Sequence, residues 1–295
     1  MRWNLKVPVA LALASLGHCQ QLCNGFAALC DRQYSNVSFV GTHDSAFNGV
    51  LPTDNQDVNV AAQLNAGIRF LQAQVHDFFG TLQMCHTSCW ELDTGTLTSY
   101  LANIKTFLDA NPNEVVTLLL VNGDNTDVSV FASAFESTGL QGYAFIPASN
   151  PLPINQWPTL RQMIAANTRL VAMLDSEANP TSYPFLLDEF SYYWETPYDV
   201  TDTTIFQQCN IDRPAGASAT GRMGIVNHFR DVSIFGLDVP DRFDASQTNA
   251  ATGTNSIGQE ASACVQKYGT WPNCVLVDWY DKGDVFTAQR MMNGL

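Results

Sequence analysis

The segment VTLLLVNGD, residues 116–124, is an apolar, β-branched-rich run that stops abruptly at the polar residues Asn122 and Asp124. Continuous apolar runs of this length are typical of strands buried on both faces, as in a parallel sheet. Five further segments have the same form, namely VSFVGTHD (37–44), RFLQAQVHD (69–77), RLVAMLDSE (169–177), MGIVNHF (223–229) and CVLVDWYD (274–281). The sequence therefore predicts a sheet of six or more buried strands that end in polar side chains.

Helical patterns separate these strands, at residues 58–66, 96–110, 128–137, 160–166, 257–268 and 285–292. Strands that alternate with helices indicate βαβ units, and no Pro-, Gly- or Ser-rich linker interrupts them. We therefore predict one α/β domain over residues 20–295, a (β/α)8-type TIM barrel that is either regular or distorted and incompletely closed. An open, doubly wound parallel sheet is the alternative. No glycine-rich phosphate loop follows the first strand, so we expect no nucleotide cofactor.

The N-terminal stretch MRWNLKVPVALALASLG has the three parts of a secretory signal peptide. Arg2 and Lys6 form a basic start, an apolar run follows at residues 7–16, and small residues come next. The apolar run is shorter than the ~20 residues that span a bilayer, which disfavours a membrane anchor. We expect residues 1–19 to be removed and the protein to be secreted and extracellular.

Eight cysteines agree with an oxidising exterior, where disulfides form. Local spacing favours the pairs Cys23–Cys30 and Cys85–Cys89, and a long-range bridge from Cys209 to Cys264 or Cys274. A zinc site at CHTSC (85–89) is the competing interpretation, disfavoured because a second ligand pair at metal spacing is missing. Asn36 begins the glycosylation sequon Asn-Val-Ser.

The composition excludes several classes of protein and partner. Hydrophobic residues make up 46% of the chain and charged residues 14%, which excludes a disordered or coiled-coil protein. The net charge of −14 disfavours nucleic acid and anionic membrane surfaces, because phosphate binding depends on Lys and Arg. We expect a monomer without membrane insertion, whose substrate is held by local contacts.

The barrel prediction places polar strand-end residues at one face, where active sites of such barrels lie. A single histidine is usually structural, but two of them at one face can supply the base and the acid of a proton-transfer reaction. The side chains gathered there are His43, Asp44, Gln72, Gln74, His76, His86, Asn122, Asp124, Asp175, Glu177, Asn227, His228 and Asp278.

The motifs GTHDS (41–45), AGIRF (66–70) and MCHT (84–87) occur in this order, with FLDANPNEVVTLLLV (107–121) and VLVDWYDKGDVF (275–286) after them. In this order the chain resembles the X region of phosphatidylinositol-specific phospholipase C, within the phospholipase-C-like phosphodiesterase barrels, and most closely their secreted fungal members. The resemblance covers nearly the whole chain after the signal peptide.

The resemblance implies a mechanism with two histidines. The residue matching His43 is the general base that deprotonates the inositol 2-hydroxyl, which then attacks phosphorus. The residue matching His86 protonates the departing diacylglycerol oxygen. Asp44 and Asp278 are expected to orient His43 and raise its basicity, as carboxylates do in other triads.

The second strand departs from the family pattern, because Gln72 and Gln74 stand where relatives carry a charged pair or calcium-binding carboxylates. A site of Asp44, Gln72, Gln74 and Asn122 has one formal charge, so it would be a weak Ca²⁺ site, and no cofactor is firmly implied. The expected substrate contacts are Gln72, Gln74, Asn122, His228, Arg230 and Trp279. For Arg230 a surface salt bridge is the favoured alternative to a phosphate contact. Arg69 lies on the opposite strand face from the glutamines, so a structural ion pair is expected there.

Three functions fit these observations. The leading one is a secreted phosphoric diester hydrolase or lyase that acts on phosphoinositide-like or related phosphodiesters. The second is a barrel with altered chemistry that binds lipid or carbohydrate. The third is a glycoside hydrolase, which needs two carboxylates across a groove and could draw on Asp175, Glu177 and Asp278. The aromatic residues expected near the mouth, which either line a lip or pack, are Phe78, Phe79, Trp90, Trp194 and Trp279.

Overall fold

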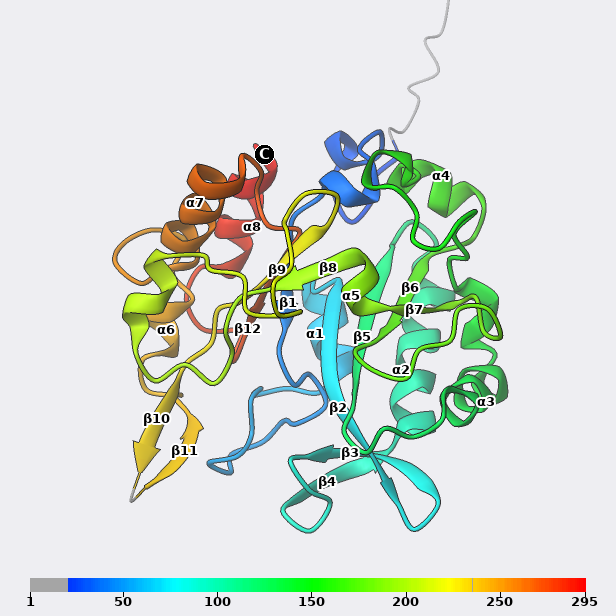
Figure 1. Cartoon of the computed structure of the whole chain (residues 1–295), viewed down its shortest axis with the longest axis horizontal. Helices are drawn as coiled ribbons and strands as arrows, with labels where there is room; N and C mark the ends of the chain where they lie inside the picture. Colours follow the sequence, from blue (N-terminus) through cyan, green and yellow to red (C-terminus); the bar gives the residue numbers. More distant parts are fainter. Residues whose placement is uncertain (1–20, 235) are drawn as a thin grey trace, which may run out of the picture.

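The computed structural model describes residues 21–234 and 236–295, so the predicted signal peptide at residues 1–19 lies outside the described residues. Eight strands form a curled parallel sheet in the order β7-β6-β5-β2-β1-β12-β9-β8 (Figure 1). The bounds are β1 (Phe39–Thr42), β2 (Phe70–Phe78), β5 (Val116–Asn122), β6 (Leu170–Leu174), β7 (Leu186–Asp188), β8 (Tyr193–Glu195), β9 (Met223–Asn227) and β12 (Cys274–Val277). All six predicted runs form strands.

The strand order is that of an incomplete barrel. Strands succeed one another around the sheet in chain order, and the last strand, β12, returns to pair in parallel with the first, β1. A doubly wound sheet reverses direction at its first strand, so that alternative is wrong. Within the part of the chain that the structure describes, no pairing joins β7 to β8, and the barrel is open there. The prediction of a distorted, incompletely closed barrel is confirmed.

Helices cover the outside of the sheet, close to the six predicted ranges. They are α1 (Val60–Ala66), α2 (Leu97–Ala110), α3 (Val128–Thr138), α4 (Leu160–Ala165), α5 (Glu189–Tyr192), α6 (Ala245–Thr248), α7 (Ile257–Tyr268) and α8 (Val285–Asn293), with 3-10 turns η1 (Ala27–Leu29), η2 (Tyr34–Asn36), η3 (Leu140–Tyr143), η4 (Ile154–Gln156) and η5 (Thr203–Gln207). Side-chain caps define several starts: Thr96 accepts from the Ser99 amide at α2, and Ser256 from the Gln259 amide at α7.

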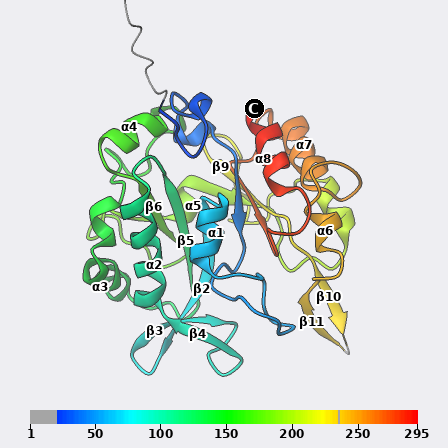
Figure 2. The same ribbon diagram turned by 180° about the vertical axis from the view of Figure 1, so that it is seen from behind.

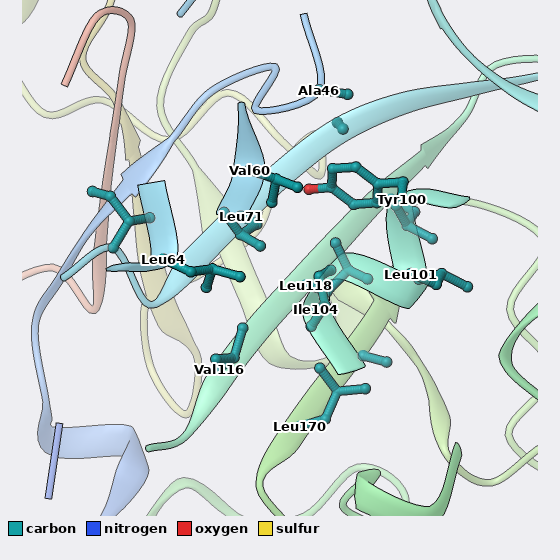
Figure 3. Close-up of a cluster of buried hydrophobic side chains, with 14 of the residues drawn as sticks. Ala46, Val60, Leu64, Leu71, Tyr100, Leu101, Ile104, Val116, Leu118 and Leu170 are labelled. Carbon is teal, nitrogen blue, oxygen red and sulfur yellow. The ribbon is translucent and has the colours of Figure 1, made fainter. Parts of the chain in front are cut away.

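The main core lies between the sheet and its helices. Leu64 of α1 and Leu101 and Ile104 of α2 pack against Leu71 of β2 and Leu118 of β5 (Figure 3). Each of these side chains is fully buried, and each such burial contributes roughly 1.5–3 kcal/mol. This packing holds the inner strands rigidly, which fixes the positions of the residues at their ends.

Two antiparallel additions project beyond the barrel at the end where the parallel strands finish. The long strand β2 continues to Phe78 and pairs with β3 (Thr81–His86), which pairs with β4 (Leu92–Thr96). On the other side, β10 (Asp231–Ile234) and β11 (Leu237–Pro240) form a separate hairpin. Figures 1 and 2 show both at the same end of the molecule. Neither was predicted from the sequence.

Three disulfides join Cys23 to Cys30, Cys85 to Cys89, and Cys209 to Cys264. They are the pairs that spacing favoured, and the open choice for Cys209 falls on Cys264 in α7. The bond between Cys85 and Cys89 excludes the zinc interpretation of CHTSC. Cys274 on β12 is buried and free. In the described ranges, no helix has both the length and the apolar character needed to cross a bilayer.

Candidate active site

A pocket of about 520 Å³ opens at the carboxyl ends of the parallel strands. His43 and Asp44, which follow β1, Gln74 of β2 and His86 at the end of β3 all line it. The pocket thus lies at the strand ends where the barrel prediction placed the site. Asp278 lies behind His43, outside the pocket lining but in contact with its ring.

A carboxylate behind the pocket lining holds the ring of His43. Its Nδ1 lies 2.9 Å from Oδ1 of Asp278, which follows β12, and donates to it because a carboxylate can only accept. Asn55 Nδ2 donates to the same Oδ1 at 3.1 Å, which fixes the carboxylate. Gln56 Nε2 donates to the main-chain oxygen of His43 at 2.8 Å and so holds the backbone. The second ring nitrogen, Nε2, therefore remains available on the pocket side of the ring.

Asp44 lies between the two histidines. Its Oδ2 is 3.5 Å from Nε2 of His43 and 3.4 Å from Nε2 of His86. The backbone at Asp44 has a φ of 43°, in the left-handed region that non-glycine residues rarely adopt. A hydrogen bond of 2.7 Å from its amide to Gln72 Oε1 holds this conformation. Strain of this kind is often retained where a side chain must be aimed at a site.

His86 stands at the end of β3, on the antiparallel extension instead of a barrel strand. The Thr87 amide donates to Gln74 Oε1 at 3.0 Å, which ties this strand end to β2. Phe47 packs its ring at 87° to the imidazole, with 5.2 Å between centroids. The disulfide of the preceding Cys85 closes the loop that follows. The second histidine is therefore delivered by the antiparallel extension, and it contacts the same oxygen of Asp44 as His43.

The electrostatics of the pocket favour the charged form of His43. Although burial alone would lower the pKa of His43, the carboxylates of Asp44 and Asp278 outweigh it and raise this pKa to about 9. Burial also raises the pKa of Asp278, and burial together with Asp278 raises the pKa of Asp231 to about 6. In the free protein at neutral pH, His43 is thus a cation held between two carboxylates.

The side-chain oxygens of the glutamines already accept protein hydrogen bonds, so they fit a Ca²⁺ site poorly. Gln72 Oε1 accepts from the Asp44 amide, and Gln74 Oε1 accepts from the Thr87 amide. Asn122 Oδ1 accepts from the Thr126 amide at 2.9 Å. Three of the four candidate Ca²⁺ ligand oxygens therefore have protein donors already, whereas Ca²⁺ needs six to eight oxygens. No cluster of three or more His, Cys, Asp or Glu in residues 21–234 and 236–295 is arranged to hold a metal.

Four expected substrate contacts lie outside the pocket, which corrects the sequence-based assignment. His228 is fully buried against Glu260, and Trp279 is 2% exposed. Arg230 forms ion pairs with Asp241 and Asp244, so protein carboxylates already neutralise its charge. The side chain of Asn122 forms two hydrogen bonds with the backbone of Thr126 and so holds the turn between them. Each side chain is used for structure, because the loops after β5, β9 and β12 turn it away from the pocket.

Two further predictions concern charged residues. Arg69 pairs with Glu114 at 2.7 Å, outside the pocket, in agreement with the ion pair expected there. Asp175 accepts from the Asn122 amide and Glu177 is exposed, and neither lines the pocket. Asp278 also lies outside the pocket lining, so none of the three carboxylates expected for a glycoside hydrolase lines this pocket.

Sequence reasoning missed the wall of the pocket opposite the histidines. Glu189 of α5 and Glu195 of β8 are buried there, and burial and the neighbouring Glu195 raise the pKa of Glu189 well above its usual range. Arg213 pairs with Glu195 and stacks over Tyr198 at 4.3 Å. It is the one arginine or lysine lining the pocket among the described residues. Glu195 ends a buried run of three residues, too short to be recognised as a strand.

Comparisons with known proteins agree on one family. The family model described as PI-PLC X 1 matches residues 29–293. The PI-PLC X domain-containing protein 1 of Arthroderma benhamiae is 50% identical over 276 residues, which cover 93% of this chain and 90% of that protein. An uncharacterized secreted protein of the same organism is 41% identical over 89% of this chain and 61% of its own length.

Solved structures show the same fold at low sequence identity. The phosphatidylinositol-specific phospholipase C of Listeria monocytogenes superposes with a TM-score of 0.58 at 14% identity, over 90% of this chain and 95% of that one. A mutant of the Staphylococcus aureus phosphatidylinositol-specific phospholipase C gives a TM-score of 0.60 at 14% identity, over 88% and 93% of the two chains. Both likenesses support the fold of an incomplete α/β barrel.

Proposed function

Because the chain belongs to the PI-PLC X 1 family, we propose that it is a secreted phosphoric diester hydrolase or lyase acting on phosphoinositide-like or related phosphodiesters. One observation carries the proposal. Nε2 of His43 and Nε2 of His86 lie 3.5 and 3.4 Å from the same oxygen of Asp44, inside a pocket of about 520 Å³. Two imidazoles that line one pocket and contact the same carboxylate can act as base and acid in one reaction.

The proposed reaction moves one proton at each histidine. His43 Nε2, once neutral, takes the proton of a hydroxyl on the substrate, and that oxygen attacks phosphorus. The phosphorus–oxygen bond to the leaving alcohol breaks, and His86 gives its proton to the departing oxygen. Asp278 keeps the proton on Nδ1 of His43 and stabilises the imidazolium that forms. In a hydrolase, water then enters and the two histidines exchange roles.

Neutral amides replace a charged clamp in this proposal. Gln74 Nε2 donates to Asp44 Oδ2 at 2.9 Å, so it orients the carboxylate without adding charge to the pocket. The positive charge that offsets the developing negative charge on phosphorus comes from the two imidazolium groups. Arg213, on the opposite wall, contributes a more distant positive charge that Glu195 partly neutralises.

The end of the molecule that carries the pocket also carries exposed aromatic side chains, and we propose that they contact the lipid surface. Phe79 is 85% exposed and Trp90 81% exposed, and both rings contact Phe78 at the β2–β3 extension. On the β10–β11 hairpin Leu237 is 71% exposed. Exposed apolar clusters of this kind mark interaction sites, including membrane surfaces. Trp194, by contrast, is buried in the core, as is Trp279.

Secretion is supported by three observations. The first is the signal-like N-terminus, the second the three disulfides, and the third the naming of a 41% identical relative as a secreted protein. Asn36 is exposed in the structure, so the sequon remains a proposed glycosylation site.

The test is product release from phosphatidylinositol and from glycerophosphoinositol by the purified protein, in Ca²⁺ and in EDTA. We expect turnover that His43→Ala and His86→Ala each abolish and that EDTA leaves unchanged. Glu177→Gln, an exposed carboxylate outside the pocket, is the control that should retain full turnover. A folded wild-type protein without turnover on either substrate would contradict the proposal and favour a barrel that only binds lipid or carbohydrate.

A further inference from the structure

The imidazole of His43 is covered on one face by the ring of Phe229. The two rings are nearly parallel, at 6° to one another, and their centroids are 3.6 Å apart. Phe229 is 3% exposed and lines both the pocket and the adjoining space beneath Arg230. One face of His43 is therefore closed to solvent and substrate, and rotation of its ring out of this plane would collide with Phe229.

His228, the residue before Phe229, is held in the barrel by contacts with α6 and α7. His228 is fully buried, with Nδ1 2.6 Å from Glu260 Oε2 on α7 and Nε2 2.8 Å from the main-chain oxygen of Thr248 on α6. Glu260 is 1% exposed and lies one helical turn before Cys264, which is joined to Cys209. This buried pair fixes the backbone at the end of β9, where the chain passes from His228 to Phe229.

From these contacts we propose that Phe229 is a positioning residue for His43, and that the buried His228–Glu260 pair holds Phe229 in place. The inference rests on the proposed function, in which His43 is the base. In this arrangement Asp278 fixes the direction of the ring nitrogens, and Phe229 fixes the plane of the ring. Together they leave Nε2 aimed into the pocket.

The stacking geometry suits the charged form of the histidine. Two neutral aromatic rings prefer offset or edge-on arrangements over a parallel face-to-face one. A cation over the face of an aromatic ring is attracted by the ring quadrupole, most strongly where water is excluded. Phe229 thus favours an imidazolium at His43 in addition to the carboxylates that face it.

The charged groups that act on His43 must be kept constant in any test of the ring. They are Asp44, Asp278 and Asp199, whose charges act on its pKa, Asp231, which responds to its charge, and His86, which shares Asp44. Phe229→Leu removes the aromatic face and leaves all of these groups in place. Phe229→Tyr retains the face and is the conservative variant. Phe135→Leu, at a fully buried phenylalanine of α3, is the matched control for loss of core packing.

The experiment combines steady-state kinetics with an NMR titration of His43, which needs no turnover. In Phe229→Leu we expect the pKa of His43 to fall by about one unit, because the cation loses its aromatic partner. We expect kcat to fall about tenfold with KM nearly unchanged, since a misplaced base slows the chemical step. Phe229→Tyr should stay within about twofold of the wild type in both readouts.

A second set of variants tests the buried His228–Glu260 pair. Glu260→Ala should lower kcat in the same way as Phe229→Leu, and Glu260→Gln, which can still hydrogen-bond to His228, should restore most of it. If Glu260→Ala does not fold, the Phe229 variants still decide whether Phe229 positions His43, and failure of Glu260→Gln to keep the wild-type pKa of His43 would argue against the role of the buried pair.

Two results would overturn the inference. The first is a His43 pKa and a kcat in Phe229→Leu that equal those of the wild type. The second is a Phe135→Leu variant with the same losses, which would show a general effect of packing. A wild-type protein without turnover would instead overturn the proposed function, and the titration would still report whether the ring stacks on His43.

Discussion

Gln74 donates a hydrogen bond from Nε2 to Oδ2 of Asp44 at 2.9 Å, so a neutral amide contacts the carboxylate that both histidines share. An amide at this position orients Asp44 but cannot offset the negative charge that develops on phosphorus. The strength of catalysis in this pocket should therefore depend on the charge at residue 74.

We predict that Gln74→Arg raises kcat on a soluble phosphodiester by about tenfold or more, because a fixed cation stabilises the charge of the transition state. Gln74→Met, which removes the hydrogen bonds without adding charge, is the control and should lower kcat. The measurement is steady-state turnover of glycerophosphoinositol. A Gln74→Arg variant that is slower than the wild type, with its fold intact, would show that charge at this strand position is not limiting.

The pH dependence of kcat/KM should follow the protonation of His43, whose pKa is raised to about 9 by Asp44 and Asp278 against the effect of burial. His43 must be neutral to act as the base and His86 must be protonated to act as the acid, so kcat/KM should depend on both titrations, and one limb of its pH profile should report the pKa of His43. Asp278→Asn removes one of the carboxylates that raise this pKa, so the limb that reports His43 should move to lower pH and the maximal rate should fall. A limb that does not move in Asp278→Asn would argue against His43 as the base.

The exposed aromatics should matter only at a lipid surface. Burying a large apolar side chain contributes roughly 1.5–3 kcal/mol, so Phe79→Ala and Trp90→Ala should each lower turnover on vesicles about tenfold. Turnover of glycerophosphoinositol should not change. Trp271→Ala, at a 40% exposed tryptophan just before β12 at the other end of the barrel, is the matched control. Equal losses on both substrates would place Phe79 and Trp90 outside surface binding.

Salt should affect turnover on anionic vesicles in a direction set by the charge of the chain. The net charge of −14 repels an anionic surface, and salt screens that repulsion. Turnover on vesicles that contain anionic lipid should therefore rise as salt is added, whereas turnover on zwitterionic vesicles should be nearly constant. A fall with salt would indicate a local basic docking site that dominates the net charge.

The disulfide between Cys209 and Cys264 should contribute strongly to stability, since it closes a segment with a sequence separation of 55. Replacing both cysteines by serine should lower the free energy of unfolding by about 4 kcal/mol in the chain-entropy model. Guanidinium unfolding of the double variant and the wild type gives the difference directly. A loss below about 1 kcal/mol would mean that the unfolded chain keeps this segment compact.

The barrel could be predicted because the apolar composition of its strands indicates that they are buried on both faces. Runs such as LLLV at 118–121 are typical of strands in a sheet covered on both faces, and the polar residues after them indicate the end at which the pocket lies. His43 and Asp278 were found in this way, since both follow such runs directly. Cys209 could not be assigned to Cys264 from spacing, because a long loop leaves several partners within reach.

The residues that were missed share a physical cause. Asn55, which fixes Asp278, lies in a loop with no periodic pattern, and Glu195 ends a strand of three residues. His228 and Trp279 follow buried strands as His43 does, but the chain turns their side chains into the protein. A strand end fixes where a residue lies, whereas the direction of its side chain depends on long-range contacts such as that between His228 and Glu260.

The missing pairing between β7 and β8 also affects how far the pocket can adapt. In a closed barrel the circumference is set by the strand number and the stagger of the hydrogen bonds, so its mouth cannot widen without breaking backbone pairs. Here a short segment, α5, links the two strands, and no ladder between them resists a change in their separation. Glu189 and Glu195 line the pocket from this seam, so this part of the wall lacks the backbone ladder that joins β1 to β12 next to His43 and Asp278.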